Sequence, residues 1–224
     1  MDGFTQFDGN LLIGIQHALN ADWLTPIMKI ITYFGEAGIF WIAVCLLLLC
    51  FRKTRRLGII CSLSLLLSFI LCNLALKPLI DRTRPWVTFE EVTAFLPPPG
   101  DSSFPSGHSA NSMSPAWAMF LATLPGKRTI RNDETGATRT EKDFGLTPCL
   151  GWKGVGADPA IMHRWSIAAV ILALLIGLSR LYLGMHYPSD VLAGLLLGML
   201  SASIVWLIVR KRETSHGIIG GKSI

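Results

Sequence analysis

Basic, histidine and aspartate side chains recur in three short groups of this 224-residue sequence. The groups are Lys77 with Arg84-Pro85, then Pro105-Ser106-Gly107-His108, and finally Ser179-Arg180 with His186 and Asp190. Arginine and lysine side chains suit phosphate oxygens, and histidine can act as a nucleophile or as a general acid. If folding brings the groups together, the chemistry that they predict is an anion site beside a nucleophile.

Three side chains supply fixed positive charge to this anion site: Lys77, Arg84 and Arg180. Backbone amides add to it, because Pro105-Ser106 is typical of a helix start and Ser106 is a plausible N-cap. The amides of Gly107 and His108 would then point outward at a helix N-terminus, where phosphate binds readily. Gly107 would also let the backbone approach the ligand closely.

His186 and Asp190 are four residues apart, across a helix start predicted at Pro188. A carboxylate at that spacing can fix one imidazole tautomer and leave the other nitrogen free to attack phosphorus. His108 would then protonate the leaving oxygen. Because the basic side chains neutralise the phosphoryl oxygens, this chemistry requires no metal and no cofactor.

The segments that must position these residues are apolar. Hydrophobic residues make up 51% of the chain, charged residues 16%, and the mean hydropathy is +0.48. This composition argues against a soluble enzyme and against disorder. Five segments are predicted to cross a lipid bilayer as helices: about 38–51, 57–76, 108–124, 167–178 with its flanks, and 191–209. The fold class is therefore all-α, an integral membrane helical bundle.

Residues 10–34 have an interrupted amphipathic pattern, with Ile27, Ile30, Ile31 and Phe34 at helical steps. We expect one or two helices that lie in the membrane interface, and a sixth span here is the alternative. The domain limits follow as 1–37 for these interfacial helices, 38–210 for the transmembrane domain and 211–224 for a tail. Within the domain, the polar stretch 125–166 has no clear periodicity and is predicted to be an unstructured connector.

Orientation follows from the basic residues. With five alternating spans, 51–56, 125–166 and the tail lie on one side and carry 15 of the 20 lysines and arginines. The positive-inside rule makes that side cytoplasmic, so the C-terminus is cytoplasmic and the three motif groups are extracytoplasmic. The net charge of +5 is thereby explained without nucleic acid as a partner. We expect a multi-pass plasma-membrane protein whose partners are the bilayer and a lipid phosphate.

The three groups resemble the motifs of the type 2 phosphatidic acid phosphatase superfamily. Lys77 to Pro85 matches K-x6-R-P, Pro105 to His108 matches P-S-G-H, and Ser179 to Asp190 matches S-R-x5-H-x3-D. The resemblance covers about 57–209. Membrane members of this superfamily usually have six spans, whereas five are predicted here.

The resemblance implies a metal-independent, vanadate-sensitive phosphatase. It makes His186 the nucleophile that forms a phosphohistidine, His108 the acid for the leaving group and Asp190 the residue that orients His186. The phosphate would be held by Lys77, Arg84, Ser106, Gly107 and Arg180. The substrates implied are lipid phosphates such as undecaprenyl diphosphate, phosphatidylglycerol phosphate or phosphatidate.

Two other functions fit some of the same residues. A lipid phosphotransferase would pass the phosphoryl group from the same histidine to a lipid acceptor. A non-catalytic phospholipid-binding protein would need the basic cluster but not the pair formed by His186 and Asp190.

Two further patterns have simpler interpretations. Gly194 and Gly198 form a G-x-x-x-G pattern that predicts close packing inside the bundle or, alternatively, a homodimer contact. Asp81 and Arg82 lie outside the motif positions and are predicted to be a surface pair.

Overall fold

The structure is a computed structural model, and it describes residues 3–19, 21–52, 54–131, 138–144 and 159–215. The N-terminal half contains α1 (Gly3–Leu19), α2 (Leu24–Tyr33), the 3-10 turn η1 (Glu36–Gly38), α3 (Ile39–Cys50), α4 (Arg55–Phe69), the π-helical turn η2 (Ile70–Leu76), α5 (Lys77–Ile80) and α6 (Pro85–Thr88). The C-terminal half contains α7 (Gly107–Thr123), β1 (Pro125–Arg131), β2 (Thr138–Phe144), α8 (Pro159–Tyr182) and α9 (Pro188–Ser215).

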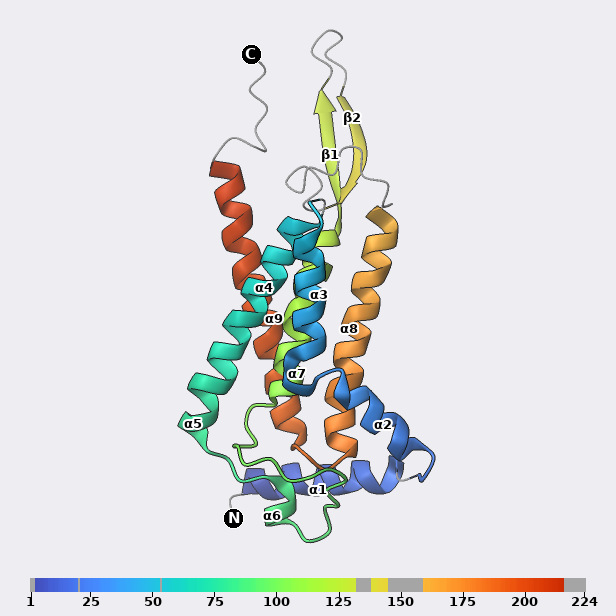
Figure 1. Ribbon diagram of the computed structural model, residues 1–224, viewed down its shortest axis with the longest axis vertical. Coiled ribbons are helices and arrows are strands. Elements are labelled where there is room, and N and C mark those ends of the chain that lie inside the picture. Colours follow the sequence, from blue (N-terminus) through green and yellow to red (C-terminus); the bar gives the residue numbers. More distant parts are fainter. Residues whose placement is uncertain (1–2, 20, 53, 132–137, 145–158, 216–224) are drawn as a thin grey trace.

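The long helices run side by side, with α7 in contact with α4, α8 and α9 (Figure 1). α7 can be surrounded because its buried residues are mostly small alanines and serines. Gly194 and Gly198 of α9 face α7, and a Cβ atom at either position would lie 2.5 Å from a backbone oxygen of α7. The geometry therefore supports close packing within the chain as the use of this pattern, because α7 already occupies the face that a homodimer would need.

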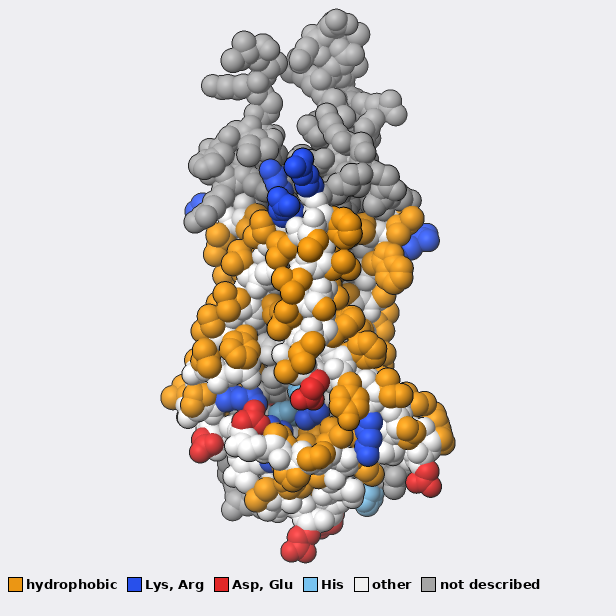
Figure 2. Space-filling model, viewed as in Figure 1, with side chains coloured by type: hydrophobic (Ala, Val, Ile, Leu, Met, Phe, Trp, Pro, Cys, Tyr) orange, Lys and Arg blue, Asp and Glu red, His pale blue; other side chains and the backbone are white. Residues whose placement is uncertain are grey.

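The outer surface of the bundle is apolar. Leucines such as Leu46, Leu66 and Leu200 are more than half exposed, and Figure 2 shows hydrophobic side chains around the middle of the molecule with charged ones gathered towards the ends. Among the described residues, four stretches are long and apolar enough to span a membrane: Leu24–Cys50, Arg55–Thr88, Ala160–Tyr182 and Pro188–Lys211. The all-helical membrane bundle predicted from sequence is confirmed. The third predicted span, α7, is not among these four stretches. It is shorter and more polar because protein rather than lipid surrounds it.

The N-terminal segment forms two helices, which agrees with the one or two helices predicted for residues 10–34, and α2 belongs to the candidate span Leu24–Cys50. α1 lies crosswise beneath one end of the bundle, and α2 leads obliquely towards α3 (Figure 1). Phe4, Phe7 and Leu11 are exposed on α1, whereas Leu12 is buried. This arrangement suits a helix in the membrane interface.

Part of the polar connector is structured, contrary to the prediction. β1 and β2 pair as an antiparallel hairpin, with Pro125 opposite Phe144 and Arg131 opposite Thr138. α8 begins at Pro159, so it also takes up the end of the predicted connector. The rest of the connector, 132–137 and 145–158, lies outside the described residues, as does 216–224 of the predicted tail.

Candidate active site

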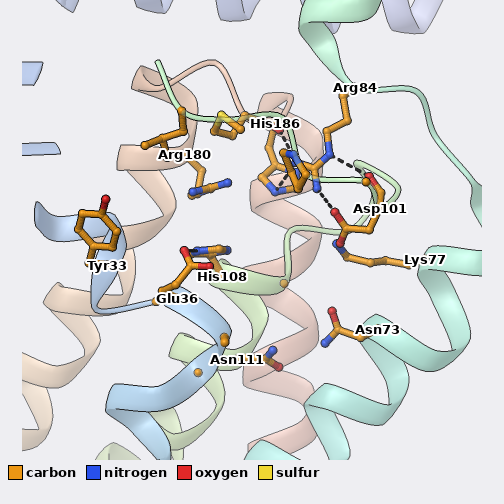
Figure 3. A pocket seen from close by; sticks show the side chains of 18 of the residues that line it. Tyr33, Glu36, Asn73, Lys77, Arg84, Asp101, His108, Asn111, Arg180 and His186 are labelled. Atoms are coloured by element: carbon orange, nitrogen blue, oxygen red, sulfur yellow. Dashed lines mark hydrogen bonds and ion pairs between the residues drawn. The ribbon is translucent and has the colours of Figure 1, made fainter. Parts of the chain in front are cut away.

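The three motif groups meet at the end of the bundle that α1 covers. They surround a pocket of about 760 Å³, lined by Lys77, Arg84, Gly107, His108, Arg180 and His186 among others (Figure 3). Each comes from the end of a helix: η2 and α5, α6, α7, α8, and the turn between α8 and α9. Ser106 and Asp190 are fully buried and do not line the pocket.

His186 is 1% exposed and is held in one orientation. Its Nδ1 lies 2.8 Å from the backbone oxygen of Ser103. Because a carbonyl oxygen only accepts hydrogen bonds, Nδ1 must carry the proton. The lone pair is therefore on Nε2, which lies 3.4 Å from Nη1 of Arg84 beside the pocket. This is the arrangement that a nucleophilic imidazole needs.

Burial lowers the pKa of His186 to about 4, even though the nearby carboxylate of Asp190 acts in the opposite direction. The positive charges of Arg180 and Arg84 add to the lowering. At neutral pH the imidazole is therefore uncharged, and its Nε2 lone pair is available to attack.

Asp190 is fully buried in the first turn of α9 and lies 3.7 Å from Nδ1 of His186. Its Oδ2 accepts hydrogen bonds from the hydroxyl of Ser103 (2.5 Å) and the amide of Tyr187 (3.0 Å). Asp190 thus lies beside His186 and holds the hydroxyl of Ser103, whose backbone oxygen contacts the imidazole. Sequence reasoning missed Ser103, because its hydroxyl and its backbone oxygen contact Asp190 and His186, which lie 87 and 83 residues away in the chain.

The predicted surface pair of Asp81 and Arg82 is wrong. The Arg82 guanidinium is only 14% exposed and pairs with Asp190 (2.6 Å) and with Asp8 of α1 (2.8 Å). The physical reason is that α5 ends at Asp81 in a left-handed conformation (φ 44°), where the chain changes direction.

His108, in the first turn of α7, is held more loosely. Its side chain is 18% exposed, and Nε2 lies 3.3 Å from a carboxylate oxygen of Glu36 in η1. Gly35 makes room for the imidazole, since a Cβ atom there would lie 2.8 Å from Cδ2 of His108. Glu36 was also missed, since it lies 72 residues from His108 in the chain.

Lys77 and Arg84 converge on the carboxylate of Asp101, which lies between them (Figure 3). Partial burial raises the pKa of Asp101, but the hydrogen bond and positive charge of Lys77, together with Arg84, outweigh it and lower that pKa overall. Asp101 is therefore an anion in contact with two of the three cationic side chains predicted to hold phosphate. Its side chain is 51% exposed, and it belongs to the loop that precedes α7.

Arg180 is buried and faces the same pocket. Nη1 donates to the hydroxyl of Thr32 (3.0 Å), whereas Nε has no hydrogen-bond partner within the described residues. A buried guanidinium nitrogen without a partner is costly. This unmet donor favours an anionic ligand.

Ser106 is the N-cap of α7, as predicted. Its hydroxyl accepts a hydrogen bond from the amide of Ser109 (3.4 Å). Gly107 faces the pocket, and a Cβ atom there would lie 3.1 Å from Oδ1 of Asn73. Within the described residues, no cluster of three or more His, Cys, Asp or Glu side chains could hold a metal ion.

A second pocket of about 340 Å³ adjoins the first, because Ala37, Gly38, Phe69 and Asn111 line both. It lies between α3 and α4. Most of its remaining lining residues are apolar, namely Ile42, Cys45, Leu46, Leu65 and Leu66. The polar pocket thus continues into an apolar one.

Comparison with known proteins gives a family match over most of the chain. The family model of the PAP2 superfamily matches residues 57–214, which include all three motif groups.

Comparisons with individual proteins support the same family. The chain is 28% identical over 176 residues to an undecaprenyl-diphosphatase of Sulfolobus acidocaldarius, an alignment that covers 78% of this chain and 66% of that protein. It is 30% identical over 198 residues to phosphatidylglycerophosphatase B of Bacillus subtilis, covering 85% and 70%. The crystal structure of a transmembrane PAP2-type phosphatidylglycerolphosphate phosphatase from Bacillus subtilis superposes with a TM-score of 0.65 at 27% identity, covering 94% of this chain and 88% of that one.

Proposed function

The chain belongs to the PAP2 superfamily, in its branch of membrane lipid phosphatases, and from this premise we propose that it hydrolyses a lipid phosphate or diphosphate at the extracytoplasmic membrane face through a phosphohistidine on His186. The observation that carries the proposal is the state of His186. It is buried and neutral, with Nδ1 bound to a carbonyl oxygen and Nε2 facing a pocket lined by three cationic side chains.

The reaction has two steps. Nε2 of His186 attacks phosphorus, the bond from phosphorus to the leaving oxygen breaks, and His108 gives that oxygen a proton. Water then attacks the phosphohistidine, His108 takes a proton from the water, and the P–N bond breaks to release phosphate. Burial and the neighbouring cations lower the pKa of His108 in the empty pocket. An anionic phosphate bound among those cations would raise it again, so that His108 can give and take a proton there.

The cations stabilise the charge on the phosphoryl oxygens. Lys77 and Arg84 already hold a carboxylate, and Arg180 has an unmet donor. A phosphate that binds Lys77 and Arg84 must displace the Asp101 carboxylate from them. Such fixed charges in a site shielded from water are worth more than in solution.

The adjoining apolar pocket supports a lipid substrate. Its lining continues from the polar pocket to the outer surface between α3 and α4, where Leu46 and Leu66 are more than half exposed. A phosphate at the cationic end would leave an acyl or prenyl tail against this lining.

The membrane face follows from the charge distribution. Fifteen of the twenty basic residues belong to segments predicted to lie at the opposite end from the pocket. By the positive-inside rule, the C-terminus is cytoplasmic and the pocket opens on the extracytoplasmic side. We keep the domain limits 1–37, 38–210 and 211–224 and place the catalytic residues in the transmembrane domain, 38–210.

Undecaprenyl diphosphate and phosphatidylglycerol phosphate are the first substrates to test, because the names of relatives point to them. Phosphatidate is the third. Purified protein in detergent with EDTA should release phosphate from at least one of them, and His186→Ala should abolish the release. Labelled phosphate transferred to a lipid acceptor, instead of to water, would support a phosphotransferase. A trapped phosphoryl group on another residue would overturn the mechanism.

A further inference from the structure

The buried carboxylate of Asp190 has a cationic partner on the side away from His186. Nη1 of Arg82 donates to Oδ1 of Asp190 at 2.6 Å and to the hydroxyl of Ser189 at 2.7 Å. The same guanidinium lies over the ring of Tyr187, 3.9 Å from its centroid. Arg82 does not line the pocket. Its side chain therefore reaches the reaction through Asp190 and the first turn of α9, while its backbone oxygen accepts the amide of Ser103 at 2.9 Å.

Arg82 is in turn held by the N-terminal helix. Its Nη2 donates to Oδ2 of Asp8 at 2.8 Å, and Oδ1 of Asp8 accepts the backbone amide of Ser189 at 3.1 Å. The Asp8 side chain is only 4% exposed, although α1 lies at the edge of the bundle. A buried carboxylate is retained where charged partners compensate it. Asp8 meets that condition through Arg82 and the N-terminus of α9.

The docking of α1 is specific along its length. A Cβ atom at Gly9 would lie 2.1 Å from the ring of Phe89, so α1 approaches that side chain as closely as only glycine allows. Further along, Nε2 of Gln16 donates to the backbone oxygens of Thr93 (2.9 Å) and Tyr182 (3.0 Å). These contacts fix the position of α1, and with it the carboxylate of Asp8.

We infer that Arg82 and Asp8 are positioning residues for Asp190, so that the interfacial helix α1 is a working part of the active site. Arg82 compensates the buried charge of Asp190 and holds its Oδ1, which leaves Oδ2 aimed at Ser103 and His186. Asp8 sets the place of Arg82 and caps α9. The inference rests on the proposed function, because Asp190 matters only if His186 is the nucleophile.

The network predicts opposite effects of its two charges on His186. Arg82→Gln removes a positive charge beside Asp190, which leaves that carboxylate freer to stabilise a protonated His186. The acid limb of the pH profile of kcat/KM should then move to higher pH, by about half a unit. Asp8→Asn removes a negative charge and should move the limb to lower pH. Arg84, Arg180, His108 and Asp101 also face His186, and they are unchanged in both variants.

The experiment measures kcat, KM and the pH profile of phosphate release by the full-length protein in detergent. The variants Arg82→Gln and Asp8→Asn should lose about 10- to 100-fold in kcat with KM within about twofold, because neither residue touches the substrate. Arg82→Lys should recover part of the loss. The double variant should lose less than the product of the single losses, since Asp8 acts partly through Arg82.

A second pair of variants tests α1 without changing any charge. Gly9→Ala should push α1 away from Phe89 and lower kcat. Gly14→Ala makes the same change in the same helix, but its Cβ atom would meet nothing within 4 Å. It should behave as wild type. The exposed residues Asp22 and Arg164 supply matched charge controls as Asp22→Asn and Arg164→Gln.

The outcomes separate the inference from the function on which it rests. If His186→Ala is inactive while Arg82→Gln and Asp8→Asn keep the wild-type kcat and acid limb, the positioning role is wrong and the proposed function stands. If His186→Ala is active, the proposed function is wrong. If Arg82→Gln does not fold, Arg82→Lys and Asp8→Asn decide. A limb that moves in the same direction in both charge variants would also overturn the inference.

Discussion

His186 and His108 face the same pocket from two regions that the protein builds differently. His186 is 1% exposed, and it is surrounded by Ser103, Arg84 and Asp190, with the network of Arg82 behind them. The His108 side chain is 18% exposed and contacts Glu36, which is itself 56% exposed.

The difference fits the roles proposed for the two imidazoles. A nucleophile must be neutral and must point one lone pair at phosphorus, so burial and a fixed tautomer favour it. An acid that later serves as a base must exchange protons with the leaving group and with water, so partial exposure favours it. Burial and contacting residues therefore distinguish two histidines that come from the same set of motifs.

A change of leaving group should separate the two histidines most strongly. With p-nitrophenyl phosphate, the departing phenolate needs no proton, so His108→Ala should still form the phosphoenzyme. Its hydrolysis should lack a base, and turnover should fall by about 10³-fold. The expected signal is a burst of p-nitrophenol equal to the amount of enzyme, followed by a stall. His186→Ala should show no burst and should lose about 10⁴-fold or more.

The reverse pattern would exchange the two roles. A burst in His186→Ala and none in His108→Ala would mean that the more exposed imidazole is the nucleophile. Arg164→Ala, remote from the pocket, serves as the control and should retain the wild-type burst.

Asp190→Asn tests how much of the orientation of His186 depends on the carboxylate. The backbone oxygen of Ser103 still accepts the Nδ1 proton in this variant, so the tautomer should be retained. We expect a loss of about 10²-fold in kcat, well below that of His186→Ala. Single-turnover rates measure it directly. Wild-type activity, or a loss as large as that of His186→Ala, would contradict the division of labour between Ser103 and Asp190.

The parts of the site that sequence could predict are those with local signals. Pro105-Ser106 and Pro188 mark helix starts, and α7 and α9 begin where these residues predict. Apolar runs predict the long helices, and the alternation of spans brings Lys77 and His186 to one end. These predictions need only residue type and spacing, and none of them depends on a tertiary contact.

The parts that sequence could not predict depend on contacts across the chain. Arg82 was paired with its neighbour Asp81, whereas the fold carries it to Asp8, 74 residues away. The role of Ser103 comes from a backbone oxygen, and that of Asp101 from the cations that it contacts. No periodicity or motif marks any of these, because each arises only when loops and α1 pack on the bundle.

The pH dependence of phosphoenzyme formation tests the burial of His186. His186 must be neutral to attack, so the rate of phosphoenzyme formation should be level above its pKa of about 4 and fall tenfold per pH unit below it. The measurement is the burst rate with p-nitrophenyl phosphate between pH 3 and pH 6, corrected for the second ionisation of the substrate, which is titrated separately. A limb centred near 6.5, the ordinary value for histidine, would show that His186 is not desolvated as its burial implies.

Asp101 is half-exposed, unlike the buried residues around His186. Its substitution should have the smallest effect on activity. Its carboxylate binds Lys77 and Arg84, so it competes with the substrate phosphate for them. Asp101→Asn removes the competing charge, and because half-exposed ion pairs contribute little, KM and the inhibition constant of inorganic phosphate should each fall by about threefold with kcat unchanged. Glu90→Gln, at an exposed position of the same outer region, is the matched control. A rise in KM would mean instead that Asp101 holds Lys77 and Arg84 in place for the phosphate. The loop that precedes α7 would then help to position the cations of the site.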